Sequence, residues 1–461
     1  MSPRGLACAL GAAALSACGA APERRGSPGG PGAGDSAATE VPSPDPAAPD
    51  TGAGDTAADT GEPAPEPPPA HNGCLFPGGA RASGALDDPR RVDALPYTDA
   101  ASTADAPGDA ADTYDCAPST RETGPERWYR FTLAEAREVR VEVADGDDVD
   151  VDVHLLSAPA IGADGAVTGC LARDDRRIVR TLGPGTYWVA VDTWASAAGV
   201  ERPGDYTLAV EGWVDGAWAE LALEPGLTWR HFSRSGDDPM RVNALLVDPA
   251  LVELAPASHG GCATVPAQAA RIGARAGINA SFYASGCVPR TFLRVDGETL
   301  ARPDLGSTQR VALWSAGATP VYRWLAAGAD DTSAPHGIGG YPSLRTDGAD
   351  AVEPLGDSDF FRGRHPRTAF GTLADGRVAF VVVDGRSSTA RGITLPDFAA
   401  LLGEMGLVDA INLDGGGSST LSVRGCSVTD AVNFPSDGGG DTHGGARAVA
   451  DGVYAWPAAG P

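Results

Sequence analysis

The stretch INLDGGGSSTLSV, from Ile411 to Val423, combines an acidic residue with three glycines and three hydroxyl side chains. Glycine has no Cβ, so such a turn can aim several main-chain N–H groups at one anion or at a crowded sugar. A second acidic residue, Asp384, ends the apolar run VAFVVVDG. Two carboxylates, Asp384 and Asp414, could supply general acid and base catalysis on a glycosidic bond. A hairpin or a surface loop would also use three glycines, so the surrounding elements must decide.

The two acidic residues follow two predicted strands that flank a predicted helix. The segment TLPDFAALLGEMG has Thr394 and Asp397 as capping residues and an apolar face, which is typical of a helix. A strand–helix–strand connection usually makes its strands parallel. We therefore expect Asp384 and Asp414 at one edge of a mixed sheet, where α/β proteins bind ligands.

Another short helix is predicted over TVPAQAARIGARAG, shortly before the segment INASFY. Thr264 is a suitable N-cap and Pro266 lies in the expected first turn. We expect the helix to end at Gly277.

The region from Glu126 to Trp213 has a different pattern, because polar and apolar residues alternate in six runs separated by Gly, Pro and Asp. This alternation predicts an all-β sandwich. Five aspartates, Asp145, Asp147, Asp148, Asp150 and Asp152, have the composition of a calcium site. However, Asp150 and Asp152 alternate with valines, which favours side chains that face water on a half-buried strand. The sandwich shows no combination of nucleophile, base and orienting partner, so we expect an accessory or binding role.

This sandwich resembles the pre-peptidase C-terminal domains of secreted bacterial peptidases over roughly Leu75 to Gly212. The resemblance depends on the aromatic-rich first strand, the Asp-rich edge and the runs GPGTYWVAV and GDYTLAV.

The first eighteen residues have the composition of an export signal that ends in LSAC. LSAC resembles the lipobox of bacterial lipoproteins, in which the cysteine, here Cys18, is lipidated. An ordinary signal peptide with an incidental cysteine remains the alternative. Residues 19–73 are rich in Pro, Gly and Ala with one large apolar residue, Val41. Such a segment buries too little apolar surface to fold, so we expect a disordered tether. These features predict a protein of the bacterial cell envelope, anchored to a membrane.

Six cysteines follow the predicted tether, three on each side of the expected boundary near Trp213. They favour disulfides of an exported protein. Either one disulfide joins the two sides or each side keeps a free thiol, and Cys262–Cys287 is our preferred pair. No compact metal motif includes any of the seven histidines, so we predict no cofactor and no ligand set that requires a metal, which leaves open whether a metal assists. The formal net charge of −26 argues against a nucleic-acid partner.

Several motifs in the second half resemble the phosphodiester glycosidase family in order and spacing. They are NASFY (279–283), GGYPSLRTDG (339–348), the segments 367–386 and 392–421, NFPSD (433–437) and RAVADGVYAW (447–456). The resemblance implies hydrolysis of a sugar-1-phosphodiester, with release of the sugar and a phosphomonoester. The animal member of the family removes N-acetylglucosamine, so an N-acetylglucosamine-like sugar is expected here. Tyr283 and Tyr341 depart from the family pattern, which bears on sugar specificity.

The resemblance also implies roles for residues of these motifs. Asp414 is the first candidate for the catalytic carboxylate and Asp384 the second. The implied substrate-binding residues are Asn279, Arg367, Thr368, Asn412, Gly415, Gly416, Gly417, Ser418, Ser419, Thr420 and Arg447. Arg367 and Arg447 would hold the phosphate, although each could equally be a surface arginine paired with a carboxylate.

We therefore predict four parts: a lipoprotein signal peptide (1–18), a tether (19–73), an accessory β-sandwich (74–215) and an α+β catalytic domain with a mixed sheet (217–461). The alternative is a non-catalytic envelope lipoprotein that binds surface glycans through the same residues.

Overall fold

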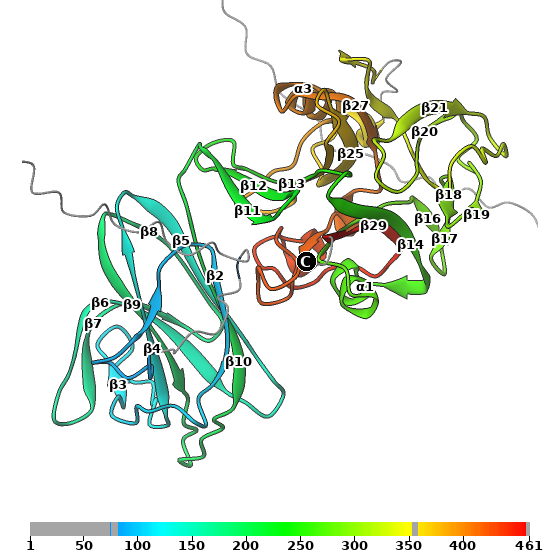
Figure 1. Cartoon of the computed structure of the whole chain (residues 1–461). Helices are drawn as coiled ribbons and strands as arrows, with labels where there is room; N and C mark the ends of the chain where they lie inside the picture. The colour runs from blue at the N-terminus through cyan, green and yellow to red at the C-terminus, as the bar shows by residue number, and fades with distance from the viewer. Residues whose placement is uncertain (1–73, 75–81, 353–357, 458–461) are drawn as a thin grey trace, which may run out of the picture. The chain divides into compact units, whose positions relative to one another are not determined.

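The computed structural model describes residue 74 and residues 82–352 and 358–457, and all of them belong to one compact unit, Pro68–Pro461. The predicted signal peptide, Cys18 and the predicted tether lie outside the described residues. Within the described part of the chain, no helix has the length and apolar character needed to cross a membrane. Figure 1 shows the arrangement of the helices and strands and labels many of them.

Residues 90–213 form two sheets that pack face to face, as the alternating pattern predicted. One sheet contains, in spatial order, β1 (Arg90–Val92), β4 (Glu126–Leu133), β9 (Gly185–Thr193), β6 (Val151–Ile161), β7 (Ala166–Asp174) and β3 (Thr113–Tyr114). The other contains β2 (Tyr97–Ser102), β10 (Asp205–Trp213), β5 (Arg137–Asp145) and β8 (Arg177–Leu182). Apolar side chains of both sheets share one core. We call this part the sandwich.

Our prediction that Asp152 faces water was wrong. Asp152 is buried and forms an ion pair with Arg173, whereas the alternating pattern had placed it facing water. Tertiary packing covers this face of β6, so strand alternation alone misassigned the side chain.

We call residues 218–457 the C-terminal region. The largest sheet of this region has eight strands. In spatial order they are β11 (Trp218–Glu224), β12 (Leu227–Arg234), β13 (Met240–Val247), β26 (Val378–Val383), β25 (Arg367–Leu373), β27 (Leu407–Asn412), β23 (Ser343–Thr346) and β24 (Ala349–Asp350). Apolar residues lie on both faces of the sheet. This explains why β26 is apolar throughout and does not alternate.

Smaller sheets complete the C-terminal region. One contains β14 (Val252–Ala263), β29 (Val449–Pro457), β15 (Ala276–Asn279) and β28 (Leu421–Val423). Another contains β19 (Glu298–Ala301), β18 (Leu293–Val295), β22 (His336–Gly340), β20 (Gln309–Trp314) and β21 (Val321–Leu325). A third pairs β16 (Tyr283–Ala284) with β17 (Val288–Pro289). Short helical segments are α1 (Val265–Ile272), α2 (Asp359–Arg362), α3 (Leu395–Glu404), η1 (Gly416–Ser418) and η2 (Ser436–Gly438).

The predicted strand–helix–strand unit is present, but the mixed sheet was wrong. Strand β25 lies between β26 and β27 and is antiparallel to both, and every described pairing of the eight-stranded sheet is antiparallel. Strand β25 thus separates the two strands that the predicted helix connects. Strands β26 and β27 still run in the same direction, so Asp384 and Asp414 follow strand ends at one edge of the sheet.

Both predicted helix starts are confirmed. Thr264 caps α1 by accepting a hydrogen bond from Ala267 N, and Thr394 caps α3 by accepting one from Asp397 N. The predicted end of α1 was wrong. The helix stops at Gly273, which has a positive φ of 71°, while Gly277 lies inside β15.

Three disulfides are formed, Cys74–Cys426, Cys116–Cys170 and Cys262–Cys287. The preferred pair Cys262–Cys287 is confirmed. Cys74–Cys426 joins residues 352 positions apart, so one disulfide does link the two sides of the expected boundary. The two-domain division itself stays a prediction, because the chain from Pro68 on is one compact unit.

Candidate active site

The glycine turn, residues 414–420, follows β27 and contains the 3-10 segment η1. Gly416 has a φ of 61°, a left-handed conformation that favours glycine. A Cβ on Gly417 would lie 2.2 Å from both Arg447 Nη2 and Asp437 Oδ1. A Cβ on Gly415 would lie 2.9 Å from the carbonyl oxygen of Pro366. The three glycines therefore allow other groups of the protein to approach the main chain closely, whereas the approach of a phosphate or a sugar stays a prediction.

Asn279, at the end of β15, connects the two ends of the glycine turn. Its Nδ2 donates to the carbonyl oxygen of Asp414 at 2.7 Å, and its Oδ1 accepts from Thr420 N at 3.0 Å. Thr368 Oγ1 lies 3.2 Å from the same Oδ1 and 3.1 Å from Ser419 Oγ. Asn279, Thr368, Ser419 and Thr420 are all buried. These predicted binding residues come together, and their hydrogen bonds hold the turn in shape.

Asp414 is half-buried. Burial raises the pKa of Asp414 to about 6, while the Ser418 hydroxyl, the Gly415 amide and the charge of Arg447 lower it. A carboxyl with this pKa changes protonation close to neutral pH, which suits general acid or base catalysis.

Asp451, on β29, is a buried carboxylate near Asp414 that we did not predict. Its Oδ1 accepts a hydrogen bond from Ser281 N at 2.8 Å. Burial raises the pKa of Asp451 to about 6, and the charge of Asp414 adds to the increase. The only sequence signal for this residue was its place in the motif RAVADGVYAW.

Asp384 lies behind the turn and is 1% exposed. Asn433 Nδ2 donates to Asp384 Oδ1 at 2.9 Å, and Phe434 N lies 3.2 and 3.1 Å from the two carboxylate oxygens. Asn433 Nδ2 also lies 3.1 Å from the carbonyl oxygen of Ser419. Burial raises the pKa of Asp384 to about 6, although these hydrogen bonds lower it in part. Asp384 thus contacts the glycine turn indirectly, through Asn433.

Asn412 also lies below the accessible surface. Its Nδ2 donates to the carbonyl oxygen of Tyr341 at 2.8 Å, and its side chain is buried. This contact joins β27 to the loop before β23.

The two predicted phosphate-binding arginines have partners of their own. Arg367 is buried and donates to the carbonyl oxygens of Phe360, Gly363 and Ile393. Burial lowers the pKa of Arg367 to about 10. Arg447 forms two hydrogen bonds with Asp437, at 2.7 and 2.9 Å.

Arg386, which follows the end of β26, is an exposed arginine that we did not predict. A Cβ on Gly416 would lie 3.1 Å from its Nη1 and Nη2, so the guanidinium lies against the glycine turn. Its Nη2 is 3.4 Å from His365 Nδ1, and no described carboxylate forms an ion pair with it. Among the described arginines at the turn, Arg386 is therefore available to bind an anion. The sequence predicted a functional residue, Asp384, at the end of this strand. It could not show that the Arg386 side chain points towards the glycine turn.

No group of three or more His, Cys, Asp or Glu side chains among the described residues could hold a metal ion.

Comparisons with known proteins agree with the motifs. Residues 272–456 match the family model described as phosphodiester glycosidase. An uncharacterised SPbeta prophage-derived protein of Bacillus subtilis, YomE, is 43% identical over 75 residues, which are 16% of this chain and 11% of that protein. The N-acetylglucosamine-1-phosphodiester alpha-N-acetylglucosaminidase of Bos taurus is 41% identical over 71 residues, 15% of this chain and 12% of that protein.

The matched segments thus span about a tenth of each of these curated relatives. Among solved structures, the zebrafish N-acetylglucosamine-1-phosphodiester alpha-N-acetylglucosaminidase catalytic domain aligns with a TM-score of 0.41 and 19% identity. The alignment covers 52% of this chain and 88% of that one. The resemblance of the sandwich to pre-peptidase C-terminal domains stays a prediction. Residues 272–456 match the phosphodiester glycosidase family, as the family motifs in the sequence predicted.

Proposed function

We propose that the chain hydrolyses a sugar-1-phosphodiester, releasing the sugar and a phosphomonoester. The observation that carries this proposal is the position of Asp414, a half-buried carboxylate with a pKa of about 6, on a glycine turn contacted by Arg386 and Arg447. A carboxylate next to cationic groups and close to accessible main chain suits a substrate that joins a sugar to a phosphate. The match of residues 272–456 to the phosphodiester glycosidase family supports the same reaction.

In this proposal the phosphate binds against the glycine turn. A phosphate is a weakly basic leaving group, so its departure depends on stabilisation of negative charge more than on a strong acid. Arg386 supplies a guanidinium that can bind phosphate oxygens bidentately. Arg447 adds positive charge next to Gly417, although its ion pair with Asp437 neutralises part of that charge. The main-chain amides of the turn complete the anion site.

Asp414 then acts on the sugar side of the scissile bond. Its ionised carboxylate activates a water molecule or stabilises the positive charge that develops at the anomeric carbon. Asp451 is a second carboxylate near Asp414, since the charge of Asp414 contributes to its raised pKa. Asp384 keeps its place as the second predicted carboxylate, but its burial favours support of the turn over contact with substrate.

A screen of the purified protein against synthetic sugar-1-phosphodiesters tests this proposal, starting with N-acetylglucosamine linked through phosphate to an alcohol. We expect release of free sugar and a phosphomonoester, and loss of release in Asp414→Asn. Saturable binding of the diesters without turnover by the parent protein would contradict the enzyme and favour the glycan-binding alternative.

We also propose that the protein is exported and attached to the cell envelope through a lipid on Cys18. The three disulfides support an oxidising compartment, and the LSAC motif supports the lipid. Membrane fractionation tests the attachment, because Cys18→Ala should move the protein to the soluble fraction. An unchanged membrane fraction for the variant would contradict the lipid anchor.

A further inference from the structure

The outer face of strand β5 in the sandwich is buried although its residues are charged. Val139, Val141 and Val143 alternate into the sandwich core, so Arg140 and Glu142 point away from it. Yet Arg140 is only 3% exposed and Glu142 only 6%. Charged side chains are rarely buried without partners. The partners come from the loop of residues 427–444, which lies between β28 and β29 in the C-terminal region.

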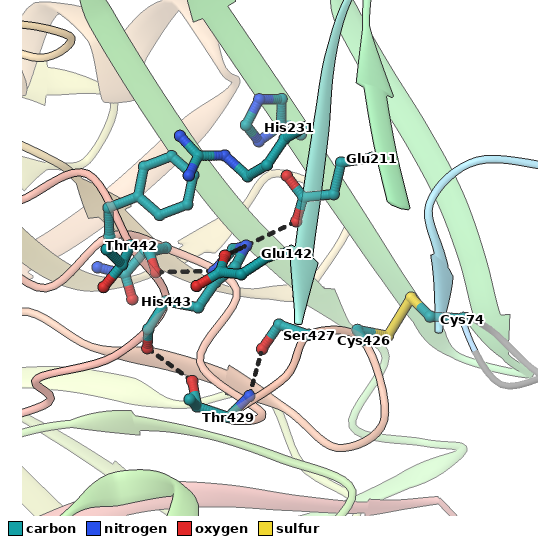
Figure 2. Close-up of polar contacts among 12 residues, drawn as sticks. Cys74, Glu142, Glu211, His231, Cys426, Ser427, Thr429, Thr442 and His443 are labelled. Atoms are coloured by element: carbon teal, nitrogen blue, oxygen red, sulfur yellow. Dashed lines mark hydrogen bonds and ion pairs between the residues drawn. A yellow bond between two sulfur atoms is a disulfide. The ribbon is translucent and has the colours of Figure 1, made fainter. Parts of the chain in front are cut away.

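The central contact joins Glu211, on β10 of the sandwich, to His443. Glu211 Oε1 lies 2.8 Å from His443 Nε2, and both side chains are buried. The other ring nitrogen, His443 Nδ1, lies 3.2 Å from the carbonyl oxygen of Asn433. Figure 2 shows His443 with Glu211 and Glu142 beside it, and Thr429 bonded to the main chain of residue 443. The imidazole thus connects the sandwich to Asn433.

A second contact runs through Arg140. Its Nη1 donates to the carbonyl oxygen of Asp441 at 2.7 Å, and its guanidinium carbon lies 4.1 Å from the centre of the Phe434 ring. Arg241, on β13, approaches the same ring at 4.7 Å. Phe434 is therefore held by a cation from the sandwich and a cation from the C-terminal region.

Asn433 and Phe434 are the residues that bind Asp384. Asn433 also contacts two residues near the glycine turn, because its Nδ2 lies 3.1 Å from Ser419 O and its Oδ1 accepts from Leu421 N at 2.9 Å. A continuous series of contacts therefore leads from Glu211 and Arg140 to the turn that carries Asp414.

We propose that the sandwich is a positioning element of the active site, with Glu211 and Arg140 as its positioning residues. They hold residues 433–443 so that Asn433 fixes Ser419 and the end of the glycine turn. The sandwich then acts on catalysis without touching substrate. The predicted effect on kcat rests on the proposed function. The predicted effect on the structure of the glycine turn does not depend on it.

Two variants weaken the two contacts separately. Glu211→Gln keeps the size of the side chain and removes its charge. Arg140→Met keeps an apolar contact with Phe434 and removes the bond to Asp441, which makes it the second test if Glu211→Gln does not fold. The matched control is Glu135→Gln, which breaks an exposed pair with Arg137 on the same sandwich.

Amide hydrogen exchange read by mass spectrometry is the first measurement, because it needs no substrate. In both variants we expect faster exchange in peptides that cover residues 433–443 and 418–421, and unchanged exchange in strands β4 and β9. The control should match the parent throughout. Unchanged exchange in residues 418–421, or an increase spread evenly over the chain, would overturn the proposal.

Kinetics with a diester that the parent hydrolyses is the second measurement. We expect kcat to fall about 10- to 100-fold, because small displacements of a catalytic group cost that much, while KM changes little. A parent-like kcat in both folded variants would overturn the proposal. If the parent hydrolyses no diester, the proposed function fails, and the exchange experiment still decides whether the sandwich positions the turn.

Discussion

The side-chain amide of Asn279 donates a 2.7 Å hydrogen bond to the main-chain carbonyl of Asp414. Because Asn279 Oδ1 also accepts from Thr420 N, one buried amide closes the glycine turn at both ends. The main chain of Asp414, which carries the carboxylate, is therefore held in place by Asn279. This arrangement explains how a loop of three glycines can hold the proposed catalytic carboxylate in a defined place.

Replacing the Asp414 carboxylate by an amide should remove most of the activity while keeping the fold. We expect Asp414→Asn to lower kcat about 100-fold or more, as for the loss of a general acid or base, with a much smaller change in KM. Steady-state kinetics and near-UV circular dichroism measure the two effects. Asp375→Asn, in the exposed turn between β25 and β26, is the control. A kcat within a few-fold of the parent would show that Asp414 is not catalytic.

Arg386 should matter for binding of the phosphate. We expect Arg386→Met to lower kcat/KM about 10- to 100-fold, since hydrogen bonds to a charged group contribute about 1.5–3 kcal/mol. Arg386→Lys should recover part of the loss, because it keeps the charge but not the bidentate geometry. Inhibition by inorganic phosphate should weaken in parallel. Arg377→Met, an exposed arginine paired with Asp375, is the control, and equal effects of the two Met variants would argue against a phosphate contact.

The pH dependence of kcat/KM should report the ionisation of Asp414. Its pKa is raised from 3.8 to about 6 by burial, so a base at this position is protonated and inactive below that pH. We expect kcat/KM to rise with pH through about 6 and then to level off. Arg447 lowers the pKa of Asp414, so in Arg447→Met the rise should move to higher pH. A profile that falls as pH rises through 6 would indicate that the protonated acid is the active form.

The Glu211–His443 pair should stabilise the fold within a limited pH range. Burial alone would raise the pKa of Glu211, but His443, together with Arg140 and His231, lowers the value from 4.5 to about 2. This contribution is present above pH 4.5 and is lost as the pH falls towards 2. Burial alone would lower the pKa of His443, but Glu211 raises it above 6.5. That contribution is present below pH 6.5 and is lost as the pH rises through the raised value.

The two signs together place the greatest stabilisation between about pH 4.5 and 6.5. We expect Glu211→Gln to lower the free energy of unfolding by about 3–5 kcal/mol near pH 6, as for a broken buried pair. The difference from the parent should shrink towards pH 2 and at alkaline pH. Urea unfolding at several pH values measures it, with Glu135→Gln as the control. A difference that does not vary with pH would contradict the assigned charges.

Local features of the chain were predictable because they depend on neighbouring residues. Thr264 and Thr394 cap helices, and Asp414 begins a glycine turn, through interactions that span three or four residues. The alternation in residues 126–213 likewise predicted two packed sheets. The Cys262–Cys287 disulfide also spans only 25 positions.

Features that depend on distant pairing were missed. The insertion of β25 between β26 and β27 is decided by sheet packing, so the strand–helix–strand pattern alone predicted a mixed sheet where the pairings are antiparallel. Asp451 reaches the site because β29 pairs with β15. Glu211 and His443 are 232 positions apart, and nothing near either residue indicates its partner. The accessory or binding role that we expected for the sandwich stays a prediction.

The most direct test of the proposed reaction is the position of the bond that breaks. Hydrolysis of a sugar-1-phosphodiester in ¹⁸O-labelled water should place the label on the anomeric hydroxyl of the released sugar, because water attacks carbon and phosphate leaves. Mass spectrometry of both products measures it, with Asp414→Asn as the background. Label in the anomeric hydroxyl is the result we expect, and label in the phosphomonoester would contradict glycosidase chemistry at this site.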